Sequence, residues 1–322
     1  MTAGEPERMR RALMGLRRYQ EAPRPRTARP VAAIAERHGA KLRDYGGEGP
    51  DLLFVPSLIN PPTVLDLGRR SLLRWLRGQG RRVLLLDWGW ADGARQHLSV
   101  AGHVEEILLP LMGELKAPPD LAGYCLGGTM AAAGAQLGGA RSLSLIAAPW
   151  HFDAFAAERP KLSELWQRPA PMAEQLGVLP MEVLQTAFWN LDPARTVRKF
   201  EALADADAAA LRSFVALEDW ANDGPPLPLA AARELLEDFF AADLPGKGQW
   251  RVAGSPIAPE ALPCPLLNIV STSDRIVPAS SAARAGERLE LARGHVGMVI
   301  GSRARAELWQ PLADWLSRVS PT

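Results

Sequence analysis

Short apolar runs alternate with longer amphipathic stretches through the first half of the chain. Residues 52–55, 82–87 and 142–148 are rich in Leu, Val and Ile and are flanked or ended by charged residues or proline, which is typical of buried strands. Residues 71–79 and 103–115 instead carry apolar side chains at helical spacing. This alternation predicts an α/β protein with a mostly parallel sheet and helices on both of its faces.

The alternation stops near residue 150 and resumes with the strand pattern PLLNIVS at 265–271. The residues between them include helical patterns such as PMEVLQTAFW and AAARELLEDFF. We interpret them as a helical cap inserted between two strands of one sheet, with tryptophans that either line a channel for an apolar chain or form the cap's own core. Four segments follow from this pattern: an N-terminal basic arm or helix at 1–39, the first half of the core at 40–149, the cap at 150–262 and the second half of the core at 263–322.

The N-terminal segment is rich in arginine and has a helical pattern of its own. Met9, Leu13, Met14 and Leu16 recur at a spacing that places them on one side of a helix. Such a basic amphipathic helix either attaches to an anionic or apolar surface or packs against the body of the protein. We favour packing, because runs of charge are usually solvated faces.

Composition narrows the class of protein. Of the 322 residues, 47% are hydrophobic, so a full core can be buried, and the net charge of +1 argues against nucleic acid as the main partner. The two cysteines fit a reducing compartment, and they show no metal-ligand spacing with the histidines, so no metal is expected. Neither a secretory signal nor an apolar run of about 18 residues is apparent, which predicts a cytoplasmic protein without a transmembrane segment.

The clearest chemical signal is the sequence GYCLGG, in which Gly123, Gly127 and Gly128 surround Cys125. It lies between a predicted strand and a predicted helix, which is the setting of a nucleophile elbow. The nucleophile of such an elbow occupies a strained turn, so its neighbours must be glycines to avoid clashes. The following helix directs its N-terminal dipole at the thiol, so Cys125 is predicted to be a nucleophile.

A base and an orienting acid are found in the second half of the core. Asp274 comes shortly after the predicted strand at 265–271, and His295 follows the next predicted strand, at 288–293. Both therefore lie at the carboxyl edge of the sheet, where the sites of α/β proteins are built. The chain order nucleophile, acid, histidine is that of the α/β-hydrolase fold, which predicts a triad of Cys125, Asp274 and His295.

An oxyanion hole in this fold takes one backbone N–H from the residue after the nucleophile, here Leu126. The second N–H comes from the loop after an early strand, which in this sequence is VPSLINPP at 55–62. We therefore expect the backbone of Leu58 or Ile59 to supply the second donor.

Several motifs together resemble the catalytic domain of polyhydroxyalkanoate synthases, in a short form that lacks their large N-terminal domain. The resemblance extends over roughly residues 40–320 in the family's order. The motifs are VPSLIN (55–60), VLDL (64–67), LLRWLRGQG (72–80), LLLDWG (84–89), GYCLGGT (123–129), WANDGP (220–225), SDRIVP (273–278) and GHVGMV (294–299).

The resemblance implies an acyltransferase that polymerises 3-hydroxyacyl-coenzyme A into polyhydroxyalkanoate. Cys125, His295 and Asp274 would be its triad, and a covalent thioester its intermediate. Acyl-coenzyme A would be the substrate, a hydrophobic polyester the product, and no cofactor would be needed. A homodimer or a second subunit stays open, as does association with polymer granules in the cytoplasm.

Hydrolysis by a cysteine nucleophile is the alternative. GYCLGG also resembles dienelactone hydrolases, although these are smaller and lack a large cap. A thioesterase or an intracellular polyester depolymerase would use the same three residues.

Overall fold

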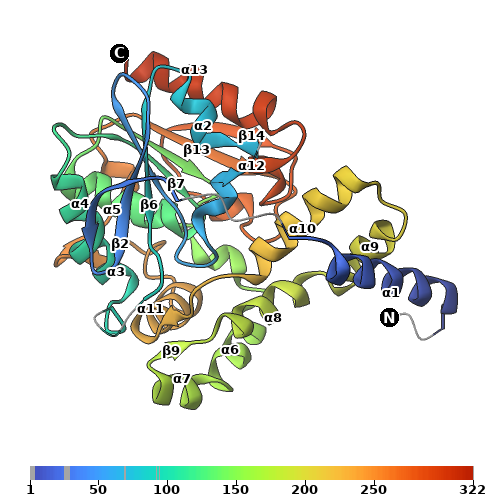
Figure 1. Cartoon of the computed structure of the whole chain (residues 1–322). Helices are drawn as coiled ribbons and strands as arrows, with labels where there is room; N and C mark the ends of the chain where they lie inside the picture. The colour runs from blue at the N-terminus through green and yellow to red at the C-terminus, as the bar shows by residue number, and fades with distance from the viewer. Residues whose placement is uncertain (1–3, 25–29, 69, 92, 94, 322) are drawn as a thin grey trace.

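The computed structural model describes residues 4–321 except 25–29, 69, 92 and 94. Its centre is an eight-stranded sheet in the order β1-β2-β6-β3-β7-β8-β13-β14 (Figure 1). The six strands from β6 to β14 are parallel, whereas β1 and β2 pair antiparallel at one edge. The mostly parallel sheet predicted from the sequence is thus confirmed. The strands are β1 (Ala33–Arg37), β2 (Ala40–Gly46), β3 (Asp51–Val55), β6 (Arg82–Asp87), β7 (Asp120–Tyr124), β8 (Ser142–Ile146), β13 (Leu266–Ser271) and β14 (Glu287–Leu291).

Both faces of the sheet are covered by helices. In the central strands, the side chains that point to one face and those that point to the other are both apolar. In β3, Leu53 and Val55 belong to one core cluster, while Leu52 and Phe54 belong to the other. The first cluster is closed by α3 (Val100–His103), the π-helical turn η2 (Val104–Leu108), α4 (Leu109–Gly113) and α5 (Leu126–Gly138). The second is closed by α2 (Leu72–Arg77), α12 (Gly297–Ile300), the π-helical turn η7 (Arg305–Trp309) and α13 (Gln310–Val319).

A largely helical segment joins β8 to β13, two neighbouring parallel strands. Besides its helices, this segment contains two short two-stranded ribbons, β9–β10 and β11–β12, which the sequence pattern did not predict. Figure 1 shows α6 and α7 at the bottom, away from α13 at the top, with α8 leading from them to α9, which lies beside α1 at the right. The elements are η3 (Phe152–Phe155), α6 (Arg159–Gln167), α7 (Ala170–Leu176), β9 (Val178–Leu179), α8 (Met181–Leu191), α9 (Pro193–Leu203), α10 (Ala208–Asn222), β10 (Leu227–Pro228), α11 (Leu229–Arg233), η4 (Glu234–Ala241), β11 (Arg251–Val252), β12 (Ser255–Pro256) and η5 (Pro259–Ala261).

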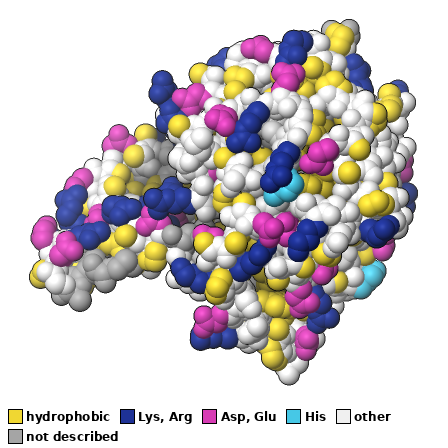
Figure 2. Space-filling model, turned by 180° about the vertical axis from the view of Figure 1, so that it is seen from behind, with side chains coloured by type: hydrophobic (Ala, Val, Ile, Leu, Met, Phe, Trp, Pro, Cys, Tyr) yellow, Lys and Arg dark blue, Asp and Glu magenta, His cyan; other side chains and the backbone are white. Residues whose placement is uncertain are grey.

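The N-terminal helix α1 (Pro6–Glu21) packs against α9 and α10 rather than against the sheet. Together these helices project from the rest of the molecule, as Figure 1 shows at the right and Figure 2 from behind at the left. Most of the predicted apolar side stays outside this contact, because Met9, Leu13 and Met14 remain 44%, 58% and 37% exposed, whereas Leu16 is partly buried. Among the described residues, no helix combines the length and the hydropathy that crossing a membrane requires.

Candidate active site

Cys125 sits in a sharp turn between β7 and α5. Its backbone φ of 56° and ψ of −133° place a non-glycine residue in a conformation that L-residues rarely adopt. The turn is held by two backbone hydrogen bonds, from the Cys125 amide to the Ile146 carbonyl at 3.0 Å and from the Gly128 amide to the Cys125 carbonyl at 2.8 Å. The strain is therefore fixed by surrounding structure and presents the thiol at the helix N-terminus.

The glycines of this turn are required by close approach. A Cβ on Gly123 would overlap the Gly128 backbone, and a Cβ on Gly127 would overlap the carbonyl of Val55. A Cβ on Gly128 would meet the Ala148 side chain in the same way. The spacing seen in the sequence thus has the physical reason that was expected for an elbow.

Asp274 and His295 lie on the loops that follow β13 and β14. His295 Nδ1 is 2.6 Å from Asp274 Oδ2, and both side chains are almost completely buried. Asp274 Oδ1 accepts hydrogen bonds from the amides of Ile276 at 2.8 Å and Val277 at 3.1 Å. Both carboxylate oxygens are therefore fixed, and the bond to Nδ1 turns the other ring nitrogen of His295 toward Cys125.

The charge environment of His295 favours its protonated form. Burial alone would lower the pKa of His295, but the charge of Cys125 and hydrogen bonds to Asp274 and Cys125 outweigh it and raise the pKa to about 10. The structure thus brings together the three residues that the sequence predicted as a triad. It supports an arrangement in which His295 holds a proton beside the sulfur.

Tyr124 is a supporting residue that sequence reasoning missed. Its ring stacks on the imidazole of His295, with centroids 4.9 Å apart and an interplanar angle of 25°. Its hydroxyl donates to the carbonyl of His295 at 3.3 Å, and burial raises the pKa of Tyr124 well above its usual value. The signal was present as the residue between Gly123 and Cys125, but that position in an elbow carries no fixed residue type.

A cavity of about 290 Å³ opens above Cys125. One side is formed by loops of the core and the other by α8, α9 and α10, so these helices cover the site. The core contributes Ser57, Ile59, Asn60, Tyr124, Cys125, Arg275, Ile276, His295 and Val296, and the helices contribute Gln185, Phe188, Trp189, Asp192, Arg195, Thr196, Lys199, Leu217, Glu218, Trp220 and Ala221.

The tryptophans of the inserted segment divide between the two roles considered for them. Trp150, Trp166 and Trp250 are buried in the core, whereas Trp189 and Trp220 line the cavity. The Trp220 indole N–H also donates to the carbonyl of Pro61 at 2.7 Å. Within the inserted segment, the aromatic side chains of the cavity wall come from the last parts of α8 and α10, and Tyr124 of the core adds another.

The loop expected to supply an oxyanion donor borders the same cavity. The Ile59 amide donates to the Ser57 hydroxyl at 3.0 Å, and Asn60 Nδ2 donates to the carbonyls of Ala221 at 3.2 Å and Asp223 at 3.0 Å. Because the Ile59 amide already donates to Ser57, we expect the amide of Leu58 to be the second donor, beside that of Leu126. The oxyanion hole itself stays a prediction.

Two further groups with reactive or basic side chains, His151 and Cys264, lie outside this site. His151 does not line the cavity, and its amide donates to the carbonyl of Ser281 at 2.8 Å. Cys264 is half-buried, and burial raises the pKa of its thiol. Within the described part of the chain, no group of three His, Cys, Asp or Glu side chains could hold a metal ion.

A cysteine on a strand–helix elbow, with an acid and a histidine after later strands, is the arrangement of the α/β-hydrolase class. The model of the alpha/beta hydrolase family matches residues 52–310, and the chain belongs to this family. Among solved structures, a putative non-heme bromoperoxidase BpoC from Mycobacterium tuberculosis superimposes with a TM-score of 0.55 at 14% identity, covering 91% of this chain and 100% of that chain. This likeness shows the fold alone.

Curated relatives indicate a family within this class. The chain is 29% identical over 295 residues to the poly(3-hydroxyalkanoate) polymerase subunit PhaC of Haloferax mediterranei, covering 84% of this chain and 59% of that protein. It is 26% identical to the subunit of the same name from Thiocystis violacea, covering 84% of this chain and 81% of that protein. The chain thus spans about three fifths of the first relative. The resemblance to the catalytic domain of polyhydroxyalkanoate synthases is confirmed, and the chain is an enzyme of the α/β-hydrolase superfamily.

Proposed function

We propose that the protein is an acyltransferase that joins 3-hydroxyacyl units from coenzyme A thioesters into a polyester, with Cys125 as its nucleophile. The observation that carries the proposal is a cysteine, held on a strained elbow beside the buried His295–Asp274 pair, beneath covering helices. The polymerase names of its relatives support the choice of substrate.

Before substrate binds, His295 has taken the thiol proton of Cys125, and in the first half-reaction the sulfur attacks the thioester carbonyl of the substrate. The bond between the carbonyl and the coenzyme A sulfur breaks, and His295 returns the proton to that sulfur. The raised pKa of His295 favours holding the proton until the leaving sulfur needs it. The amides of Leu126 and Leu58 would stabilise the negative oxygen that forms on the way.

In the second half-reaction, the hydroxyl of another 3-hydroxyacyl unit attacks the acyl group on Cys125. His295 takes the hydroxyl proton and returns it to the departing Cys125 sulfur, so an ester forms and the enzyme is restored. A cysteine suits this sequence. The first step exchanges one thioester for another at little cost in free energy, and the second forms a more stable ester.

The surroundings proposed for this activity follow from the resemblance. We expect no cofactor, a cytoplasmic location with attachment to polymer granules, and assembly as a homodimer or with a second subunit. The segment 150–262 acts in this proposal as a cap that limits the access of water to the thioester.

The test is to mix the protein with 3-hydroxybutyryl-coenzyme A and to follow three products by mass spectrometry and chromatography: acylated Cys125, oligoesters and free hydroxy acid. We expect coenzyme A release with acylated Cys125 and short oligoesters before free acid. Cys125→Ala should release no coenzyme A, and Cys264→Ala, its matched control, should behave like the unaltered protein. Free acid that forms as fast as coenzyme A from the first turnover, without oligomer, would instead establish the hydrolase alternative.

A further inference from the structure

The helix α1 approaches α9 more closely than ordinary side chains allow. A Cβ on Gly15 would overlap the carbonyl of Phe200 and would also press on the amide of Ala204, so only glycine fits at this crossing. Gly15 is the one residue of α1 that is buried. The two helices are therefore fitted to each other along their backbones.

Arg18 adds a polar anchor at the C-terminal end of α9. Its guanidinium donates to the carbonyls of Leu203 and Ala204 at 2.7 Å each and of Ala206 at 2.6 Å. The last carbonyls of a helix have no partner within the helix, and a cation at that end also interacts favourably with the helix dipole. A side chain of α1 thus completes the end of α9.

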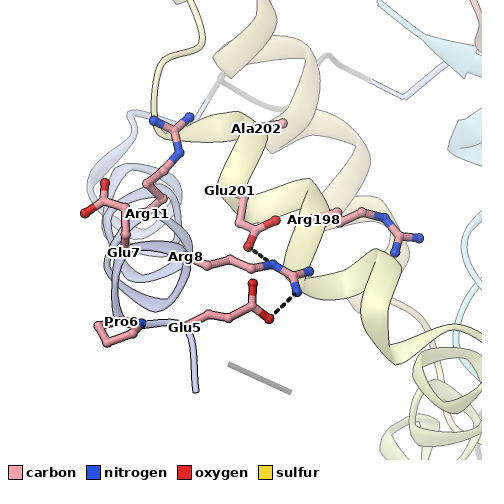
Figure 3. A pocket seen from close by; sticks show the side chains of 8 residues that line it. All are labelled: Glu5, Pro6, Glu7, Arg8, Arg11, Arg198, Glu201 and Ala202. Carbon is pink, nitrogen blue, oxygen red and sulfur yellow. Dashed lines mark hydrogen bonds and ion pairs between the residues drawn. The ribbon is translucent and has the colours of Figure 1, made fainter. Parts of the chain in front are cut away.

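Ion pairs and aromatic contacts extend this interface. Arg8 pairs with Glu201 and lies beside Glu5 in the shallow groove between the helices (Figure 3). The Tyr19 ring lies edge-on to Phe200 and Phe214 with centroids 6.1 and 6.0 Å away, and its hydroxyl donates to Asp219 at 2.7 Å. The pair of Arg8 and Glu201 is only partly buried, with side chains 30% and 17% exposed, and such pairs contribute little, so Gly15, Arg18 and Tyr19 form the main part of the contact.

The other side of α9 belongs to the active site. Arg195, Thr196 and Lys199 line the cavity above Cys125, although none of them contacts α1 through a hydrogen bond or ion pair in the described residues. At the start of α9, Asp192 accepts from the Arg195 amide at 2.9 Å. The same carboxylate pairs at 2.5 Å with Arg275, which directly follows Asp274 in the chain.

The helix α9 is thus held at one end by the loop of the buried acid and at the other by α1. We propose that α1 and the following residues to Arg24, here called the clasp, hold α9 and α10 in place as a wall of the active-site cavity. Gly15, Arg18 and Tyr19 are positioning residues: they touch no substrate, but they set where the cavity wall stands. For its kinetic consequences the clasp rests on the proposed function, whereas its effect on the cavity does not.

Gly15→Ala is the first test. Alanine raises the helix propensity of α1, so a loss cannot come from a weaker helix and must come from the crossing with α9. Leu13→Ala, on the exposed side of the same helix, is its control. Arg18→Ala removes the three carbonyl bonds without a clash. Arg17→Ala, which among the described residues loses its pair with Glu21, is the matched control.

Two readouts do not depend on the reaction. Hydrogen exchange at 193–222 and alkylation of Cys125 by iodoacetamide should both be about tenfold faster in Gly15→Ala and Arg18→Ala, because the wall opens more often. The melting temperature of the sheet core should stay unchanged, and Arg18→Lys should restore part of the protection. Unchanged exchange and alkylation in both variants would overturn the clasp.

The third readout is the Michaelis constant for 3-hydroxybutyryl-coenzyme A. It should rise several-fold while kcat changes by less than about twofold, since the clasp acts on binding and leaves the triad in place. An equal fall of kcat in Gly15→Ala, Arg18→Ala and their two controls would also overturn the clasp. If the unaltered protein does not turn over this substrate, the proposed function fails, while exchange and alkylation still decide whether the clasp exists.

Discussion

Replacing Asp274 by asparagine tests the triad most directly, because the structure dictates how asparagine must sit. The amides of Ile276 and Val277 are fixed donors at 2.8 and 3.1 Å to Oδ1, so the amide oxygen of the introduced asparagine has to take that place. Its NH2 group then occupies the position of Oδ2, 2.6 Å from Nδ1 of His295. A donor there forces the proton of the neutral ring onto the other nitrogen, which faces Cys125.

A ring in that tautomer cannot accept the thiol proton. The substitution also removes one of the two charged groups that raise the pKa of His295 to about 10, so the imidazolium is less favoured. We expect acylation of Cys125 to slow about ten-thousand-fold, as for the same change in a serine triad, which corresponds to about 5 kcal/mol of activation free energy. The isosteric change should leave the fold intact.

The assay is a single turnover with excess enzyme, quenched in acid, with acylated Cys125 quantified by mass spectrometry. Glu260→Gln, which changes an exposed carboxylate on η5 outside the cavity lining, is the control for a general loss of negative charge. A loss below about tenfold in Asp274→Asn, or an equal loss in Glu260→Gln, would refute the orienting role of Asp274.

Three further predictions concern separate features. Iodoacetamide should label Cys125 faster than Cys264, whose thiol pKa is raised by burial. The two labelling rates are measured by peptide mapping, and equal rates would contradict this prediction. Gly127→Ala should lower the free energy of unfolding by about 2–4 kcal/mol, because the added carbon overlaps the Val55 carbonyl, and its denaturation midpoint should fall; an unchanged midpoint would show that the elbow can relax. Burial lowers the pKa of His103 to about 4, below its unfolded value near 6.5, so stability should fall as the pH drops from about 6.5 to 4; His103→Phe should flatten that part of the curve, and an unchanged slope would contradict the assignment.

Much of the sheet could be predicted because burial on both faces leaves continuous apolar runs, as in 82–87 and 266–271. The edge strand β1 was missed for the converse reason: its sequence AIAER has four exposed residues and no clear alternation. Cys125, Asp274 and His295 could be found because an elbow and the carboxyl ends of strands impose positions on them.

Contacts between distant segments could not be found in this way. The amphipathic pattern of α1 pointed to its apolar side, yet the helix packs through Gly15 and Arg18 against carbonyls some 185 residues away. Tyr124 and Asn60 likewise act through partners that local periodicity does not encode. Such partners are determined by tertiary packing, which one sequence states only indirectly.

The bonds of Asn60 and Trp220 tie the loop at 55–62 to the end of α10. In the proposed reaction, admission of a substrate and stabilisation of its negative oxygen are consequently not independent events, since moving α10 away from the core would pull on the loop expected to supply the second amide. With its entrance open, the enzyme would for that moment be a poor catalyst. Water that enters together with substrate would then meet an acyl group at the time when the site is least able to hydrolyse it.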